Sequence, residues 1–412
     1  MPPIQKICVQ TGRPFQVSEL EQRLRQSFNA GLPDIHPYER LRYLMCFRNI
    51  STLYYDQCDL CGKQTVSVWG ENPDFPVYCP SCWNSDRWEL PQLDLDLDRP
   101  FFDQFKELVS KTPHFSQSLL NTENSDFCNM GNGLKNCYMT FNMTFGEDCY
   151  YTYGGMNLKN CVDALLSDES EYLFESMNCR KSYQVFWSEL AINCTECHFI
   201  YDCVDCTNCT LSTGLRHKQY VFLNEQLTPG AYAEKIKDLQ TGDYATIQVY
   251  LKKYEELKKA YPKKYVLGAR NEDVTGNIIF DSKNLVDSYH ALYCEDSANL
   301  FNIWRTKDSL DTVAFGGTGI EKVYSCVTVG HQSMDLKFCV NSYDSCHELE
   351  YCFFVVSSHN SFGCAFGKKL EFRILNKQYS PEEYVTTLQA LKAKMVERGE
   401  YGQMFRTFLR RW

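Results

Sequence analysis

A short phrase recurs along this chain at a fixed interval of twelve residues, and no other feature restricts the fold so strongly. Its three copies are Lys135-Asn136-Cys137, Glu147-Asp148-Cys149 and Lys159-Asn160-Cys161. From Cys161 to Cys206 a Cys or Ser then recurs every nine residues. A small residue at a fixed interval, with polar residues on one side and aromatic residues on the other, is typical of a stacked repeat. The pattern predicts a β-solenoid in which each repeat buries its apolar face against its neighbours.

The small residue of each repeat is expected to point inward, where neighbouring repeats stack too closely for a large side chain. The Asn or Asp before it suits a turn, because its side chain can bond the backbone and tolerates a left-handed conformation. The predicted structural ladder consists of Cys137, Cys149, Cys161, Cys179, Cys197 and Cys206. The cysteines from Cys194 to Cys209 are numerous enough for a metal or an iron–sulfur cluster, but buried free cysteines acting as small hydrophobes explain them better.

The phrase and its interval return 148 residues later. The later copies are Lys283-Asn284-Leu285, Glu295-Asp296-Ser297 and Lys307-Asp308-Ser309. Both arrays also finish with a β-forming segment followed by Thr228-Pro229 or Ser380-Pro381, which is the pattern of a helix N-cap and first helical residue. An internal duplication accounts for these matches in the same order.

The predicted fold is mainly β with flanking helices, an N-terminal zinc ribbon and two tandem β-solenoid (β-helix-like) arrays. Its expected parts are a zinc-ribbon domain (1–95), a first array (96–228), a helical linker (229–270), a second array (271–379) and a C-terminal helix (380–412). An amphipathic helix starting at Phe101 is expected to cap the first repeat of the first array, since exposed ends of a solenoid need covering.

Two Cys-x-x-Cys pairs predict one Zn²⁺ site. Cys58 and Cys61 form the first pair, and Cys79 and Cys82 form the second after a spacer of seventeen residues. Two such pairs are typical of a zinc ribbon, in which four thiolates meet one tetrahedral Zn²⁺ at the tips of two hairpins. Four protein ligands leave no open coordination position, so the predicted role is structural rather than catalytic.

A segment near the N-terminus resembles a third knuckle that has one cysteine. Cys8 is followed by Thr11 and Gly12, where the first knuckle of the zinc site has Cys61 and Gly62. A second zinc held by Cys8, His36 and Cys46 is conceivable from the residue types, but a degenerate, metal-free hairpin is the favoured interpretation.

The chain of 412 residues has a net charge of −10, which argues against a protein coated in basic surface for nucleic acid. It has no run of eighteen apolar residues and no signal-peptide core at Met1-Pro2-Pro3. We therefore expect a cytoplasmic protein that does not contact a membrane and keeps its 22 cysteines reduced or bound to metal.

The motifs predict a binding protein and no catalytic site. The leading hypothesis is a non-enzymatic zinc ribbon that contacts nucleic acid, or the transcription and translation machinery, from a rigid solenoid. Its candidate contact residues are Arg40, Arg42, Arg48, Lys63 and Arg87. The first alternative is a protein-interaction or self-assembling scaffold, including a homo-oligomer, that uses the solenoid surfaces. A carbohydrate-active enzyme on the solenoid face is the least favoured alternative.

Several phrases spread over nearly the whole chain carry a family resemblance. They include Cys8-x-x-Thr11-Gly12, Trp83-x-Ser85-Asp86-x-Trp88, Arg99-Pro100-Phe101-Phe102-Asp103, and the Asn-Cys-Tyr and Glu-Asp-Cys-Tyr phrases that contain Cys137 and Cys149. In these phrases the chain resembles a family of uncharacterised zinc-ribbon proteins with Cys-rich repeats from candidate-phyla bacteria of very small genome. The resemblance implies an N-terminal double knuckle followed by the repeats. Thr11 and the His36–Arg40 stretch depart from the cysteines of that family, and no activity comes with the resemblance.

Overall fold

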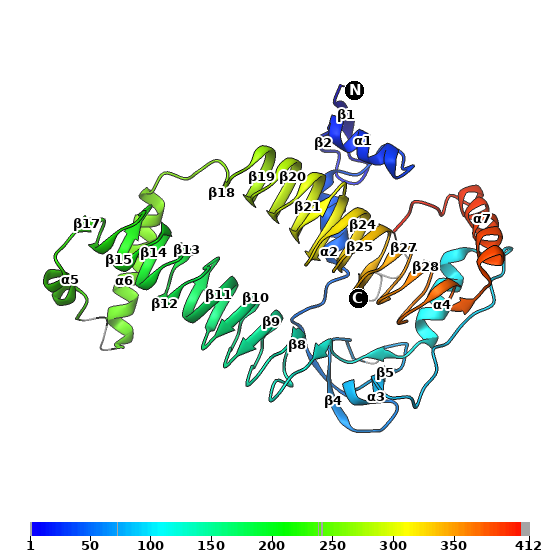
Figure 1. Ribbon diagram of the computed structural model, residues 1–412, viewed down its shortest axis with the longest axis horizontal. Coiled ribbons are helices and arrows are strands. Elements are labelled where there is room, and N and C mark those ends of the chain that lie inside the picture. Colours follow the sequence, from blue (N-terminus) through cyan, green and yellow to red (C-terminus); the bar gives the residue numbers. More distant parts are fainter. Residues whose placement is uncertain (1, 72, 238, 240–241, 405–412) are drawn as a thin grey trace.

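The computed structural model describes residues 2–71, 73–237, 239 and 242–404. It is mainly β, with two long runs of parallel strands and helices along their flanks (Figure 1). We call the runs the first stack, β7 to β16, and the second stack, β18 to β29. A linker connects the two stacks at one end. The N-terminal elements β1, β2, α1 and α2 lie beside the second stack, whereas β4, α3 and β5 lie near β8 at the start of the first stack (Figure 1).

In the first stack the chain returns to the same position every twelve residues. Tyr153 of β10 pairs with Leu165 of β11, and Val185 of β12 pairs with Cys197 of β14, each in parallel register. The strands are β7 (Leu119–Leu120), β8 (Asn129–Asn132), β9 (Phe141–Glu147), β10 (Tyr153–Lys159), β11 (Val162–Met177), β12 (Tyr183–Phe186), β13 (Glu189–Ile192), β14 (Thr195–Val204), β15 (Thr207–Thr213) and β16 (Gln219–Phe222), followed by the antiparallel β17 (Glu225–Gln226).

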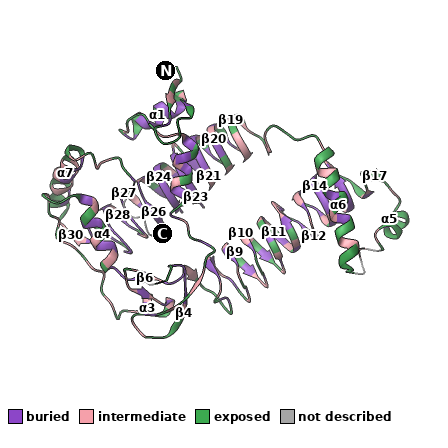
Figure 2. Ribbon diagram, turned by 180° about the vertical axis from the view of Figure 1, so that it is seen from behind, coloured by how far each residue is buried: buried purple, intermediate pink, exposed green. Residues whose placement is uncertain are grey.

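The backbone of the first stack repeats every three residues rather than every two. Every third residue from Asn136 to Leu223 has a φ between +43° and +70°. The residue that follows each of these is buried at nearly every position, as the burial pattern of β11 illustrates. The Asn and Asp of the recurring phrase occupy left-handed positions, as expected, with φ +51° at Asn136 and +52° at Asp148. Buried residues consequently run the length of both stacks (Figure 2).

The cysteines predicted as one ladder all point inward, but they do not form one column. Residues twelve apart stack on each other, so Cys137, Cys149 and Cys161 share a column that continues through Leu173 and Val185 to Cys197. Cys179 and Cys206 lie in two other columns, because a nine-residue step moves the inward position around the stack. All six cysteines are buried, as predicted, and the ladder positions are distributed over three columns.

The second stack follows the same rule with a less regular step, which is eleven residues at Glu272↔Lys283. Its strands are β18 (Gly268–Ala269), β19 (Glu272–Phe280), β20 (Lys283–Leu292), β21 (Glu295–Trp304), β22 (Thr306–Lys307), β23 (Leu310–Gly316), β24 (Ile320–Gly330), β25 (Ser333–Lys337), β26 (Val340–Tyr343), β27 (His347–Glu350), β28 (His359–Phe362) and β29 (Glu371–Ile374), followed by the antiparallel β30 (Lys377–Gln378). The pairing step rises to fourteen residues at Leu310↔Tyr324, and to thirteen at Val323↔Leu336. Gly316, with φ +82°, lies at the longer insertion, where a Cβ would come within 1.7 Å of the Trp304 carbonyl oxygen.

Both stacks end in the same capping structure. Asn224 and Asn376 have positive φ, and each accepts a hydrogen bond at its Oδ1 from a backbone N–H eleven residues earlier. The amides of Gln226 and Gln378 each donate to three backbone carbonyl oxygens at corresponding positions. The same side-chain contacts therefore close the final pairing of both stacks.

The helices of the described residues are α1 (Glu19–Ser27), α2 (Pro37–Met45), α3 (Pro80–Trp83), α4 (Phe101–Lys111), α5 (Pro229–Lys235), α6 (Tyr244–Ala260) and α7 (Pro381–Glu397). Several of them pack on the stacks. The first stack is covered by α6, whose Tyr250 and Tyr254 pack on Phe199. Residues predicted as a linker thus include a helix that packs on the first stack.

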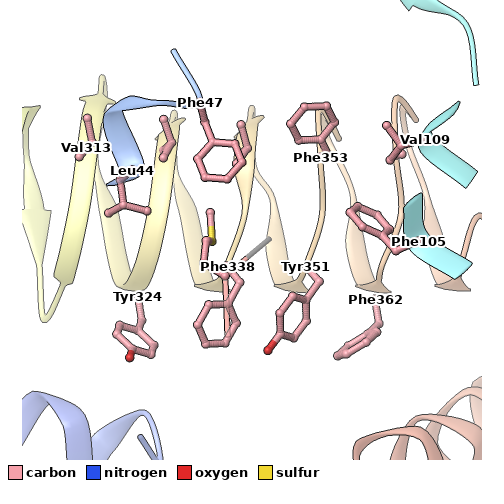
Figure 3. Packing of buried hydrophobic residues seen from close by; sticks show 14 of the residues in the cluster. Leu44, Phe47, Phe105, Val109, Val313, Tyr324, Phe338, Tyr351, Phe353 and Phe362 are labelled. Atoms are coloured by element: carbon pink, nitrogen blue, oxygen red, sulfur yellow. The ribbon is translucent and has the colours of Figure 1, made fainter. Parts of the chain in front are cut away.

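Helix α4 covers the second stack, not the start of the first stack. Phe101 packs against Tyr351 and Phe362, and Figure 3 shows Phe105 and Val109 above the same row of aromatic side chains. The expectation that this helix caps the first array is wrong. Its apolar face packs on aromatic residues of the second stack.

The N-terminal helices are fixed to the second stack by buried charges as well as by apolar contacts. Leu44 and Phe47 lie on the strands of the second stack (Figure 3). Beside them, Arg25 Nη2 lies 3.2 Å from Asp311 Oδ2, and Arg40 Nε lies 3.0 Å from Asp311 Oδ1. Glu21 accepts from both arginines at 2.9 and 2.7 Å. A buried pair is costly to break on one side, so this cluster determines where α1 and α2 dock.

The remaining strands are short and N-terminal. They are β1 (Ile4–Ile7), β2 (Pro14–Val17), β3 (Tyr54–Gln57), β4 (Gln64–Ser67), β5 (Val77–Tyr78) and β6 (His114–Phe115). Strands β1 and β2 form one antiparallel hairpin and β3 and β4 form another, while β5 and β6 pair in parallel. The two hairpins and the segment around β5 contain the cysteines of the candidate metal site and its degenerate counterpart.

Candidate metal centre

The first cysteine pair lies in the turn between β3 and β4. The Cys58 N–H donates to the Lys63 carbonyl oxygen at 2.9 Å, and the Gly62 N–H donates to the Cys58 carbonyl oxygen at 2.8 Å. Gly62 has a φ of +71°, a left-handed conformation that glycine adopts without steric cost. This tight turn brings the Cys58 and Cys61 side chains to the same side of the hairpin.

The second pair follows β5 and begins a short helix. Cys79 is the N-cap of α3, Pro80 is its first residue, and Cys82 lies within it. The Asp59 N–H donates to the Val77 carbonyl oxygen at 3.0 Å, and the Val77 N–H donates to Asp59 Oδ2 at 2.7 Å. These two bonds hold the pairs together. The predicted hairpin tip is present at the first cysteine pair. The second pair instead lies where the strand β5 leads into the short helix α3.

The four thiol groups converge on one point. The sulfur atoms of Cys58, Cys61, Cys79 and Cys82 all lie within 4.8 Å of one another, and Cys61 Sγ lies 4.0 Å from Cys79 Sγ. A tetrahedral ion with Zn–S bonds of about 2.3 Å separates its sulfurs by about 3.8 Å. The Cys79 N–H also donates to Cys58 Sγ at 3.2 Å and so links the two pairs. These four residues can hold a metal ion.

The charge state of the cluster also fits a cation. Burial opposes ionisation of Cys79, but hydrogen bonds from Ser81 and from the Cys82 backbone outweigh it and lower the Cys79 pKa to about 6. Burial and the neighbouring thiols raise the pKa of Cys82 to about 12. Four thiolates at these distances repel one another, so a bound cation is what allows all four to ionise together.

Arg87 is the nearest charged partner of this cluster. Its Nη2 donates to Cys82 Sγ at 2.6 Å, so the guanidinium offsets the negative charge of the thiolate. The sequence identified Arg87 as a candidate nucleic-acid contact, and the structure places its side chain on the metal-site sulfur. Arginine or lysine near a Cys-x-x-Cys pair would be the sequence signal for such a role.

The other predicted contact residues are not equivalent to one another. Arg40 is committed to the buried cluster with Glu21 and Asp311. The Arg48 side chain turns into the protein, and two of its nitrogens are buried. Arg42 and Lys63 are exposed, and Arg42 lies 2.8 Å from Glu39. The five residues therefore do not form a common basic surface.

The first hairpin reproduces the backbone of the metal site with other side chains. The Cys8 N–H donates to Arg13 and the Gly12 N–H donates to Cys8, both at 2.9 Å, and Gly12 has a φ of +68°. His36 is the N-cap of α2 and precedes Pro37, as Cys79 precedes Pro80. A hydrogen bond from Thr11 is the largest influence that lowers the pKa of Cys8 to about 7.

The positions equivalent to the four ligands are Cys8, Thr11, His36 and Glu39. Glu39 pairs with Arg42. The predicted second zinc site uses Cys46 instead of Glu39. Cys46 lies at the opposite end of α2 from His36, and a helix of this length separates the two by about 15 Å. The structure does not bring Cys8, His36 and Cys46 together. Within the described residues, the Cys58–Cys82 group is the one set of Cys, His, Asp and Glu side chains close enough to share an ion.

An exposed row of aromatic rings begins beside the metal site. Tyr55 on β3 contacts Phe127 with ring centroids 5.9 Å apart, Phe127 contacts Tyr138 at 5.5 Å, and Tyr138 contacts Tyr151 at 5.8 Å. Tyr55 is 71% exposed, Tyr138 is 41% exposed and Tyr151 is 56% exposed. We call Tyr55, Phe127, Tyr138 and Tyr151 the aromatic row. It joins the metal-site hairpin to the surface of the first stack.

Comparison with known proteins yields little. No protein-family model and no curated protein matches the sequence. Among solved structures, the crystal structure of a predicted acetyltransferase from Desulfovibrio desulfuricans G20 matches with 10% identity and a TM-score of 0.12. The match covers 54% of this chain and 61% of the other. So low a score establishes neither a shared fold nor a shared activity. None of the helices in the described part of the chain has the length and apolar character needed to cross a membrane.

Proposed function

We propose that this protein is a non-enzymatic scaffold that binds a protein partner along the aromatic row. In this proposal a structural zinc ribbon fixes the hairpin that carries Tyr55, and two duplicated β-solenoid arrays provide a rigid base. The aromatic row is the observation that carries the proposal, because the protein exposes these rings in an unbroken line of contacts.

Zinc suits the four cysteines better than other metals. Soft thiolate ligands in a tetrahedral arrangement favour Zn²⁺ or iron–sulfur chemistry, and two short pairs around one point fit a single ion. With four protein ligands the ion would lack an open position for substrate. Its proposed role is to hold β3, β4 and α3 together. The buried apolar cluster in this region is small and consists mainly of the cysteines themselves.

The twelve-residue register supports the solenoid interpretation. In each stack, most strands pair with one parallel strand on either side. A buried interior runs along the length of each stack. The matching end structures at Asn224 and Asn376 support the internal duplication. Such a rod is stiff, so the rings along its surface are preorganised and lose little conformational freedom when a partner binds.

Tyrosine rings on a rigid surface are typical of protein interfaces. They supply a large contact area with few rotatable bonds, and Tyr is enriched among residues that dominate binding energy. Nucleic acid would require a concentration of basic side chains along its backbone. Arg40 and Arg87 are committed to Asp311 and Cys82, which leaves a protein partner as the better match.

The test compares two double variants of the full-length protein. Tyr138→Ser with Tyr151→Ser removes the middle of the aromatic row, and Tyr289→Ser with Tyr293→Ser removes two similarly exposed rings from the second stack. Each protein is purified from its own cells after nuclease treatment, the co-purified components are identified by mass spectrometry, and binding is measured again with the isolated component.

The proposal predicts a protein, or a second copy of this chain, whose affinity falls at least tenfold in the aromatic-row variant alone. Equal binding by both variants would contradict it. Recovery of nucleic acid that dissociates at high salt would instead support the zinc ribbon with Arg42 and Lys63 as a nucleic-acid contact.

A further inference from the structure

One column of residues on the first stack contains two members of the aromatic row and leads on to two carboxylates. Its members are twelve residues apart in sequence, so each lies one turn of the stack beyond the previous one. They are Phe127, Met139, Tyr151, Asp163 and Glu175, which we call the Phe127 column. Tyr151, Asp163 and Glu175 are exposed. Beyond them the same direction leads to Phe199, which α6 covers.

The spacing of this column matches one peptide conformation. Neighbouring turns of the stack are about 4.8 Å apart, so every second member of the column recurs after about 9.6 Å. A polyproline II helix has three residues per turn and rises about 3.1 Å per residue, so every third residue recurs after about 9.3 Å. Residues i, i+3 and i+6 of such a peptide therefore face Phe127, Tyr151 and Glu175 in turn. In an extended β-strand the alternate residues recur after about 6.7 Å, which does not match.

The side chains along the column indicate which residues such a peptide carries. Tyr138 and Tyr151 are exposed and stand nearly perpendicular to each other, at 87°. Surfaces lined with aromatic rings bind proline-rich segments, because a polyproline II helix is already extended and loses little conformational freedom on binding. At the other end, the exposed carboxylates of Asp163 and Glu175 are complementary to a lysine or arginine. The net charge of −10 also favours a basic peptide over an acidic one.

We propose that the Phe127 column binds a proline-rich segment with the pattern Pro-x-x-Pro-x-x-Arg or Pro-x-x-Pro-x-x-Lys, read in either chain direction. One proline packs on Phe127 and the other on Tyr151, while the basic side chain pairs with Glu175 and Asp163. This inference rests on the proposed function and narrows it to one class of protein partner.

The chain does not supply such a segment itself. Among its 412 residues, two prolines are three apart at Pro73 and Pro76 alone. The residues at the next positions of the pattern are Gly70 on one side and Cys79 on the other, and neither is basic. The segment therefore belongs to another protein and not to a second copy of this chain.

The experiment measures the binding of short fluorescent peptides to the full-length, metal-loaded protein by anisotropy. The parent peptide is Pro-Ala-Ala-Pro-Ala-Ala-Arg, which is tested together with its reversed sequence. One control peptide has alanine in place of both prolines. A second has one extra alanine between the prolines, which changes the spacing and keeps the charge. A third has glutamate in place of the arginine.

Protein variants test the two ends of the column separately. Tyr138→Ser with Tyr151→Ser removes two rings of the aromatic row, and Glu175→Lys reverses the charge at the other end. Glu169→Lys is the matched control for the charge reversal, because Glu169 lies in a different column of β11. Both glutamates are exposed and left-handed, with φ +47° at Glu169 and +43° at Glu175.

The parent peptide, in one of its two directions, is expected to bind the wild type and Glu169→Lys with the same affinity. Loss of the prolines, a changed spacing or the double tyrosine variant should each weaken binding about tenfold or more. Glu175→Lys should also bind the parent peptide more weakly, and it should bind the glutamate peptide more tightly than the wild type does.

Equal affinity of the wild type for the parent peptide and the peptide with changed spacing would overturn the inference, because the match of spacing is its basis. Absence of binding by every peptide would overturn it as well. The inference would also fail if the wild type self-associated and the double tyrosine variant did not, since the row would then bind a second copy.

Failure of the inference is distinguishable from failure of the proposed function. A co-purified protein that requires Tyr138 and Tyr151 but lacks the proline pattern would contradict the inference and support the function. A co-purified protein that binds the aromatic-row variant and the second-stack variant equally would contradict both.

Discussion

Arg87 donates a hydrogen bond from Nη2 to the sulfur of Cys82 at 2.6 Å. Contacts of this kind around a metal site typically change metal affinity 10- to 100-fold when they are removed. Arg87→Ala should therefore bind zinc about 10- to 100-fold more weakly than the wild type, as measured by competition with a chromophoric chelator. Arg42→Ala, at an exposed arginine away from the sulfurs, serves as the control and should bind zinc normally.

Loss of a metal ligand should have a local effect. Cys58→Ser or Cys82→Ser should release the ion and expose the amides of β3, β4 and α3 to hydrogen exchange, because few apolar side chains hold this region together. The amides of α1, α2 and both stacks should keep their protection. Cys46→Ser, at an exposed thiol, should retain the ion. If the Cys58→Ser variant kept the zinc content of the wild type, the assignment of Cys58 as a zinc ligand would be wrong.

The stack interior should accept a small polar residue but not a large one. Cys179 is fully buried, and its thiol lies 3.6 Å from the Met177 carbonyl oxygen. Ser167 and Ser170 already make this kind of bond to the carbonyl two residues earlier. Cys179→Ser should therefore cost about 1 kcal/mol or less, while Cys179→Phe should lower the free energy of unfolding by about 3 kcal/mol or more. Urea titration measures both; a severe loss with Ser would indicate a metal or disulfide role.

The left-handed positions should reject β-branched residues. Asn178 has a φ of +55°, and the left-handed conformation costs an ordinary residue about 1 to 2 kcal/mol. Asn178→Val should destabilise the first stack by at least that amount, whereas Asn178→Gly should remain within about 1 kcal/mol of the wild type. Met177→Val, at the preceding extended residue, is the matched control. Equal losses in both valine variants would argue against the three-residue backbone repeat.

His114 should make the protein less stable in acid. It is buried between Phe75 and Phe366, and burial lowers its pKa to about 3 from an ordinary value of about 6.5. Below pH 6.5 the unfolded chain binds a proton that the folded protein excludes, so stability falls as the pH drops from 6.5 toward 3. This difference amounts to about 3 kcal/mol at pH 4.

Replacement of His114 by Phe should remove that part of the pH dependence. The comparison is the change in the free energy of unfolding between pH 7 and pH 4, measured in the wild type and in His114→Phe. The variant loses the hydrogen bond between Nε2 and the Val109 carbonyl oxygen, so its stability at pH 7 can fall, but its slope with pH should be smaller. Equal slopes would contradict a role for His114.

The repeat is evident in the sequence, whereas its three-dimensional geometry is not. Twelve and nine, the two observed intervals, share the factor three, and three is the period of the backbone. The sequence does not reveal this period, because Asn and Asp are the residues expected at left-handed positions, whereas here these positions also hold Leu166, Tyr172 and Trp187. Pairing with both neighbours in the stack offsets the local cost at these residues, and local propensity does not include that pairing.

The four cysteines of the candidate metal site were predictable because they lie in two short local patterns. The docking of α1, α2 and α4 on the second stack was not, because it depends on surfaces far apart in sequence. Arg40 has the sequence context of a free basic residue, but Asp311, 271 residues further along the chain, lies beside it. Spacing within a segment contains no information about such a partner.

The position of Asp311 has a consequence for biosynthesis. Residues 19–45 emerge from the ribosome well before Asp311, and the first stack also emerges in between, so Arg25 and Arg40 lack their final counter-charge through most of translation. The first stack can assemble from contacts twelve residues apart, whereas α1 and α2 must wait with their apolar faces exposed. A nascent chain released before β23 would keep those faces uncovered, and such chains should be the ones that most need a chaperone.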